Sequence, residues 1–124
     1  MKHFRDYLTE AKQTGIHLEG DLDAMNCKEL ESLGNLKTVE GFVYLDGCKA
    51  LKSLPNGLVV GRDLNLTNCT VLTKLPNGLE VGEDLHLLGC TALKSLPKDL
   101  IVQGFIYGAS DELKEKYKDK YRLR

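Results

Sequence analysis

The four cysteines of the chain stand at a constant spacing, with Cys27, Cys48, Cys69 and Cys90 each 21 residues after the one before. Around the last three, the sequence repeats almost unchanged as LxLxxCxxLxxLP, and a degraded copy around Cys27 has Gly34 in place of proline. Such regular spacing is typical of a repeat array, in which each unit buries its apolar face against its neighbours. The spacing therefore predicts one stacked structural unit for every 21 residues.

Each unit contains a strand pattern followed by turn residues. Leu64 and Leu66 alternate with polar residues, as they would in a strand that is buried on one side only. Proline, asparagine and glycine follow one another at residues 55–57 and 76–78, and this turn chemistry disfavours a regular helix on the return path. We expect one parallel strand in each unit and an irregular connection between strands.

After the last proline-containing unit, Phe105, Ile106 and Tyr107 predict a further strand with no cysteine after it. We expect this strand to begin one residue late, because Gln103 lengthens the turn before it. The array would then consist of four cysteine-containing turns and a truncated fifth strand.

The shared LxLxxCxxLxxLP pattern resembles the leucine-rich repeat family over roughly residues 16 to 108. Its LP ending and short unit are most similar to the bacterial and bacteriophage branch, whose best-known members are secreted effectors. This chain differs in carrying cysteine where those effectors usually have asparagine. The resemblance implies an α/β repeat fold, a short curved solenoid with a concave parallel sheet of about five strands, an irregular convex side and a helical cap at each end.

The two ends of the chain differ from the repeats. Residues 2–13 predict an amphipathic helix, within an N-terminal cap of residues 1–15. Residues 111–121 predict another helix, with Ser110 as its N-cap, inside a C-terminal segment of residues 110–124 that finishes in a basic tail. The repeats would occupy residues 16–109 between these caps, which an open solenoid needs at its ends.

The start of the chain carries a second resemblance. The sequence MKHFRDYLTEA is similar to the capsid-targeting peptide of internal head proteins in contractile-tailed bacteriophages, through its Met-Lys start, an aromatic residue and a Leu-x-Glu tripeptide. In that family a prohead protease cuts after the glutamate, which here implies processing after Glu10 and packaging in a virion head. A cap helix with incidental similarity is the alternative.

The cysteines have three interpretations. One tetrahedral zinc ion holds each sulfur at about 2.3 Å, whereas strands about 4.8 Å apart would place the first and last cysteine roughly 14 Å from each other. Disulfides between neighbours are not excluded by distance, but parallel side chains and a reducing compartment disfavour them. We favour a ladder of small buried thiols at the bend after each strand. Since His3, His17 and His86 fall in different segments, we expect no metal ion and no cofactor.

Composition narrows the classes of partner. The net charge is −1, the calculated pI is about 6.3, and 42% of the residues are apolar. No field of one sign would attract nucleic acid or a membrane surface, and no stretch approaches the ~18 apolar residues of a membrane span. The start of the chain also lacks the apolar core of a secretory signal. We therefore expect an intracellular, soluble protein that binds neither nucleic acid nor membrane. The two resemblances imply the bacterial host cytoplasm, or a virion head, as its location, and we expect a monomer rather than an oligomer.

Function is expected in the strand residues that the repeat leaves free to vary. Because the leucines point inward, the residues beside and between them would line the concave face. They form an acidic stripe with aromatic side chains, and the residues expected to contact a partner are Asp21, Asp23, Phe42, Tyr44, Asp46, Asp63, Asn65, Asp84, His86, Phe105 and Tyr107. Aromatic anchors beside charges are typical of protein interfaces. The alternative is that Phe42 and Phe105 fold back into the core and the acidic residues are merely solvated.

The sequence holds no nucleophile beside a histidine base, no phosphate-binding glycine loop and no HExxH motif, so we expect no enzymatic activity. His86 could act with Asp63 and Asp84 as acid and base, but solvated surface groups are favoured. We expect a protein-protein interaction module, in a bacteriophage or effector protein that targets a host defence factor. A structural component of a phage particle and a substrate-recruiting repeat domain of an effector system are the alternatives.

Overall fold

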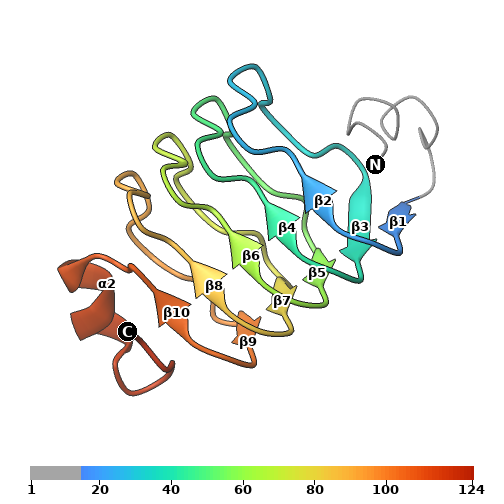
Figure 1. Ribbon diagram of the computed structural model, residues 1–124. Coiled ribbons are helices and arrows are strands. Elements are labelled where there is room, and N and C mark those ends of the chain that lie inside the picture. Colours follow the sequence, from blue (N-terminus) through green and yellow to red (C-terminus); the bar gives the residue numbers. More distant parts are fainter. Residues whose placement is uncertain (1–14) are drawn as a thin grey trace.

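The computed structural model describes residues 15–124, and in this range the chain winds into a parallel β-solenoid (Figure 1). Each turn adds one short strand to each of two five-stranded parallel sheets. The first, here called the return sheet, consists in order of β1 (Ile16–Leu18), β3 (Leu36–Val39), β5 (Val59–Val60), β7 (Glu80–Val81) and β9 (Ile101–Val102). The second, the ladder sheet, consists in order of β2 (Leu22–Asp23), β4 (Val43–Tyr44), β6 (Leu64–Asn65), β8 (Leu85–His86) and β10 (Ile106–Tyr107).

The strands of the ladder sheet are stacked without any shift in register. Each residue pairs with the one 21 positions further on, and the first aligned set is Leu22, Val43, Leu64, Leu85 and Ile106. The expected one-residue delay before β10 is therefore wrong. Gln103 takes the position that Gly82 has in the preceding turn, and no residue is added. The N–H of Gln103 donates to Val81 (3.0 Å), just as the N–H of Gly82 donates to Val60 (2.8 Å).

The alternation within the strands gives the solenoid its core. Val43 and Leu45 are fully buried, whereas Tyr44 between them is half-buried, and Leu64, Asn65 and Leu66 repeat the pattern. Burial of one aliphatic side chain of this size contributes roughly 1.5–3 kcal/mol. Within residues 15–124 no polar or charged residue belongs to the core. Apolar packing between turns and backbone hydrogen bonds along the solenoid therefore hold the fold together.

The return path differs from its prediction. Instead of an irregular connection, the residues after each Pro-Asn-Gly turn form strands of the return sheet, which lies behind the ladder sheet in Figure 1. Val60 of β5 and Val81 of β7 are buried, while Glu80 points outward. β-branched residues favour this extended backbone. The loops that follow the cysteines contain no strand or helix, so within the repeats the regular structure is β rather than α/β.

The cysteines lie at the bend after the strands of the ladder sheet. Cys48, Cys69 and Cys90 are buried, Cys27 is half-buried, and all are free thiols. Each buried thiol donates to a backbone carbonyl of the previous turn, and the pairs are Cys48 with Ala24 (3.0 Å), Cys69 with Leu45 (3.2 Å) and Cys90 with Leu66 (3.0 Å). The prediction of a buried thiol ladder is confirmed for these three residues.

Just before each cysteine the backbone adopts a left-handed conformation. The residues there alternate along the solenoid as Asn26 (φ 58°), Gly47 (φ 77°), Asn68 (φ 63°) and Gly89 (φ 80°). Glycine and asparagine adopt this conformation at the lowest cost. A Cβ atom at Gly47 would overlap the side-chain oxygen of Asn26, and one at Gly89 would overlap that of Asn68. An asparagine in one turn thus favours a glycine in the next.

The C-terminal end closes the solenoid with a helix and a short extended segment. Helix α2 (Asp111–Tyr117) begins at the N-cap Ser110, whose hydroxyl accepts from the N–H of Leu113 (3.2 Å). Leu113 is buried against the last turns. The chain then returns, and residues 122–124 pair in parallel with β10 through Ile106. The predicted C-terminal helix is confirmed, although it ends at Tyr117 rather than at residue 121.

The predicted N-terminal helix and the processing site at Glu10 lie outside the described residues. Within the part of the chain that the structure describes, no helix is long and apolar enough to cross a membrane.

Candidate functional site

The outward side of the ladder sheet, here called the ladder face, presents side chains in three rows that run across the turns. The central row is Asp23, Tyr44, Asn65, His86 and Tyr107. The row that precedes it in sequence is Asp21, Phe42, Asp63, Asp84 and Phe105. The row that follows it is Met25, Asp46, Thr67, Leu88 and Ala109. The structure thus brings all the residues expected to contact a partner together on one side of the sheet. Ala109, which ends the third row, is buried.

Three aspartates of the first row each form a hydrogen bond with the backbone of the following turn. Their Oδ1 atoms accept backbone N–H groups 21 residues further on, in the pairs Asp21 with Phe42 (2.8 Å), Asp63 with Asp84 (2.9 Å) and Asp84 with Phe105 (2.8 Å). A hydrogen bond to a charged acceptor contributes about 1.5–3 kcal/mol. These carboxylates are therefore more than solvated surface charges.

Acidic side chains surround Tyr44 near the N-terminal end of the ladder face. Partial burial, followed by the negative charges of Asp21, Asp63, Asp23 and Asp46, raises the pKa of the Tyr44 hydroxyl above its ordinary value of 10.0. The Oδ1 atom of Asp46 is buried and has no hydrogen-bond partner. This end of the face therefore presents concentrated negative charge beside an aromatic ring.

Aromatic side chains lie at both ends of the ladder face. Phe42 and Tyr44 are stacked, with ring centroids 5.7 Å apart and an interplanar angle of 10°. Phe105 and Tyr107 pack at 6.0 Å with their rings tilted by 53°. Phe42 and Phe105 are half-buried and do not belong to the core. The alternative in which these two rings fold back into the core is therefore wrong.

Two arginines contribute to the face and were not predicted from the sequence. The guanidinium of Arg62 lies 5.6 Å from the ring centroid of Phe42, and that of Arg124 lies 4.0 Å from the ring centroid of Phe105. Arg62 also pairs with Glu83 at 3.3 Å. Both cation–π contacts join residues that are far apart in the sequence, so the pairs could not be recognised from neighbouring residues. The one sequence signal for Arg62 was its position directly before Asp63.

One mixed cluster of ionisable groups lies near the centre of the face. Nε2 of His86 is 3.4 Å from Oδ2 of Asp63, and one ligand atom each of Asp63, Asp84 and His86 lies within 4.8 Å of the others. The His86 ring stacks on Tyr107, with centroids 5.2 Å apart and an interplanar angle of 12°. The proximity that the sequence indicated for these three residues is thus confirmed.

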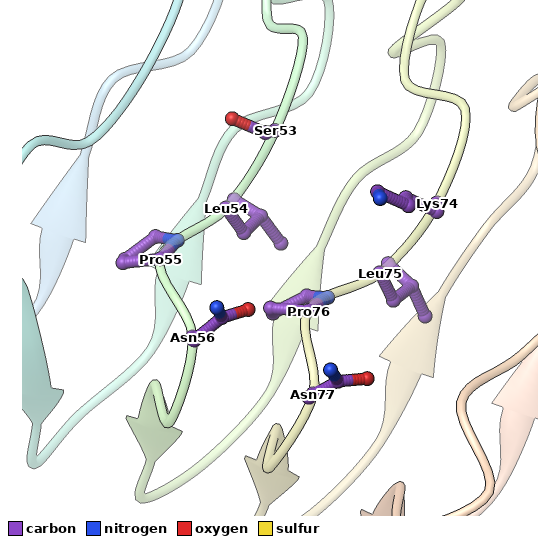
Figure 2. A pocket seen from close by; sticks show the side chains of 8 residues that line it. All are labelled: Ser53, Leu54, Pro55, Asn56, Lys74, Leu75, Pro76 and Asn77. Atoms are coloured by element: carbon purple, nitrogen blue, oxygen red, sulfur yellow. The ribbon is translucent and has the colours of Figure 1, made fainter.

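A groove lies between two loops, away from the ladder face. Figure 2 shows this groove, which is lined by residues 53–56 and 74–77 and has a volume of about 400 Å³. Asn56 and Asn77 take matching positions in the two turns, as do Pro55 and Pro76. Among the described residues that line it, Lys74 is the only ionisable one.

The fold and the ladder face together define a short parallel β-solenoid with one chemically distinctive sheet. Comparisons with models of known protein families, with curated proteins and with solved structures gave no match to the chain. The function of the ladder face is therefore inferred from its own geometry.

Proposed function

We propose that the protein is a non-catalytic binding module that holds a partner protein on the ladder face. The observation that carries this proposal is the row of half-buried aromatic rings beside exposed apolar side chains on a sheet with fixed register. Leu88 is 63% exposed and Met25 is 46% exposed in the third row. Exposed apolar groups next to rigid aromatic anchors are typical of protein interfaces.

The charge of the face favours a basic partner segment. Four carboxylates surround Tyr44. A lysine or arginine of the partner would find both the negative charge and the face of an aromatic ring there. The same negative charge disfavours nucleic acid as the occupant of this surface.

We also propose that the solenoid is of the leucine-rich repeat type, in its bacterial and bacteriophage branch, with the ladder sheet as the concave side. The LxLxxCxxLxxLP pattern supports this assignment, and its leucines lie in the core. The resemblance of residues 1–11 to capsid-targeting peptides supports a bacterial host protein as the partner, with host defence as the process affected.

A capture experiment with matched variants tests the proposal. The purified chain is immobilised and exposed to bacterial extract, and retained proteins are identified by mass spectrometry. Leu88→Asp and Tyr107→Ala alter the ladder face, whereas Ile101→Asp alters β9, where Ile101 is 44% exposed on the return sheet. Wild type and Ile101→Asp should retain the same protein, and the two ladder-face variants should lose it. Thermal unfolding establishes beforehand that all variants are folded.

Two results would contradict the proposal. Retention of no specific protein by the wild type would leave the ladder face without a partner. Equal retention by Leu88→Asp, Tyr107→Ala and Ile101→Asp would place the interaction elsewhere on the molecule.

A further inference from the structure

The cluster of Asp63, Asp84 and His86 contains both oxygen and nitrogen donors from two neighbouring turns. All three side chains are half-buried, and the side chains of His86 and Asp63 are 31% and 24% exposed. An imidazole between two carboxylates is a ligand set that divalent transition metals accept. The imidazole distinguishes this cluster from the purely acidic group around Tyr44.

Contacts outside the cluster fix the orientation of each of these side chains. Oδ1 of Asp63 is held by the N–H of Asp84, and Oδ1 of Asp84 is held by the N–H of Phe105. The stacked ring of Tyr107 holds the imidazole of His86. Supporting contacts of this kind orient metal ligands and lower the cost of bringing them together. One carboxylate oxygen of each aspartate and Nε2 of His86 remain available.

The distances within the cluster fit a small bridging ion better than a direct hydrogen bond. The 3.4 Å between Nε2 of His86 and Oδ2 of Asp63 exceeds the range of about 2.7–3.2 Å for a good hydrogen bond. An ion bound at about 2.0–2.1 Å from each ligand in a tetrahedral arrangement would separate two ligand atoms by about 3.3 Å. The ligand atoms of all three residues lie within 4.8 Å of one another, so an ion drawn between them needs only small shifts of these side chains.

We propose that Asp63, Asp84 and His86 bind one divalent transition-metal ion on the ladder face, with Mn²⁺ and Zn²⁺ as fitting ions. Two carboxylates neutralise the charge of the ion, and neutral His86 supplies the nitrogen ligand. The remaining coordination positions face solvent. Since the buried thiols belong to a different side of the sheet, they take no part in this site. The proposal is independent of whether the ladder face binds a partner protein.

Mn²⁺ is the probe of choice, because thiolates are poor ligands for it and the cysteines then do not interfere. The chelator-treated, reduced chain is titrated with Mn²⁺ while free Mn²⁺ is followed by electron paramagnetic resonance. We expect one saturable site per chain, with affinity reduced at least about tenfold by His86→Gln and by Asp84→Asn. Among residues 15–124, the His86 side chain has no hydrogen bond to backbone, so His86→Gln tests the site without loosening the turn.

Matched controls separate ligand loss from general effects. Asp21→Asn removes a carboxylate with the same backbone role but no histidine beside it, and His17→Gln removes an imidazole that contacts Thr38 on the return sheet. Both controls should bind Mn²⁺ like the wild type. Absence of saturable binding up to about 1 mM Mn²⁺, the weak end of the range for specific divalent-cation sites, would overturn the proposal. So would a loss of affinity in His17→Gln equal to that in His86→Gln.

Discussion

Burial determines the chemistry of the cysteine side chains. It raises the pKa of Cys69 to about 12 and that of Cys90 to about 11, and it raises the pKa of Cys48 as well. The thiolate is the reactive form of cysteine, so a thiol that stays protonated is chemically inert. The repeating cysteine therefore serves the fold as a small apolar residue with one weak donor, which each turn uses to contact the turn before it.

These pKa values predict that the protein loses stability at alkaline pH. In the unfolded chain the thiols ionise near their ordinary value of 9.0, whereas the folded state keeps them protonated to a higher pH. The folded state therefore binds more protons above pH 9, and the free energy of unfolding falls as pH rises from 9 towards 12. Urea unfolding at a series of pH values measures this slope.

Variants assign the slope to particular thiols. Cys69→Ala should flatten the decline above pH 9, because it removes one of the thiols whose pKa burial raises. An identical slope in wild type and Cys69→Ala would show that other groups cause the alkaline loss.

Among the elements, α2 and the segment after it form the least repetitive part of the described chain. Ser110 caps the helix, Leu113 inserts into the core, and the hydroxyl of Tyr117 bonds with the backbone of Leu96. Tyr121 reaches the carbonyls of Pro97 and Leu100. The two tyrosines thus tie the C-terminal segment to the last loop of the solenoid.

Loss of the helix cap should weaken this end measurably. Ser110→Ala leaves the N–H of Leu113 without its acceptor, and such a change costs about 1 kcal/mol. Urea unfolding followed by circular dichroism gives the difference from wild type. Ser95→Ala, at an exposed loop position, is the matched control and should change stability by less than about 0.5 kcal/mol. Equal effects of the two substitutions would contradict the assignment of Ser110 as the cap.

The ladder sheet was predictable because its residues combine a 21-residue repeat with strict alternation over several positions. The return sheet was not, since two residues such as Val59 and Val60 are too few for a period to be read. The residues of the ladder face could likewise be assigned from the repeat. Their contacts across turns, such as Asp63 with the N–H of Asp84, depend on side-chain orientation, which the repeat does not encode.

The whole molecule behaves as a one-dimensional stack. Sheet pairing joins each turn only to the turns on either side of it, and the step of 21 residues is the same throughout the ladder sheet. Stability of such arrays is approximately a sum over turns and the interfaces between them. The alternation of Asn26, Gly47, Asn68 and Gly89 adds a second period, which spans two turns.

An inserted pair of turns should therefore be tolerated and should stabilise the protein. A second copy of residues 43–84 placed after Asp84 preserves both the register and the alternation of glycine with asparagine. The slope of unfolding free energy against urea should rise by roughly a third, in proportion to the added buried surface. Urea unfolding of the lengthened chain and of the wild type gives both this slope and the free energy of unfolding.

A single inserted turn provides the contrast. A copy of residues 64–84 would set two asparagines in neighbouring turns, where the side chain of Asn68 would meet the Cβ of its copy. This insertion should raise the free energy of unfolding by less per added turn than the two-turn insertion does. Asn68→Gly in the copied turn should bring the gain per turn back to that of the two-turn insertion. Equal gains per turn for all three chains would argue against the two-turn coupling.

The pairing of residues 122–124 with β10 also bears on polymerisation. A stack of matching parallel strands is open at both ends, so that an uncovered last turn could receive the first turn of another copy and extend into a filament. Here the place of a further strand is filled by the chain itself, with Arg122 and Arg124 bonded to Ile106. This segment therefore occupies the backbone donors and acceptors that another copy would need to extend the ladder sheet beyond β10.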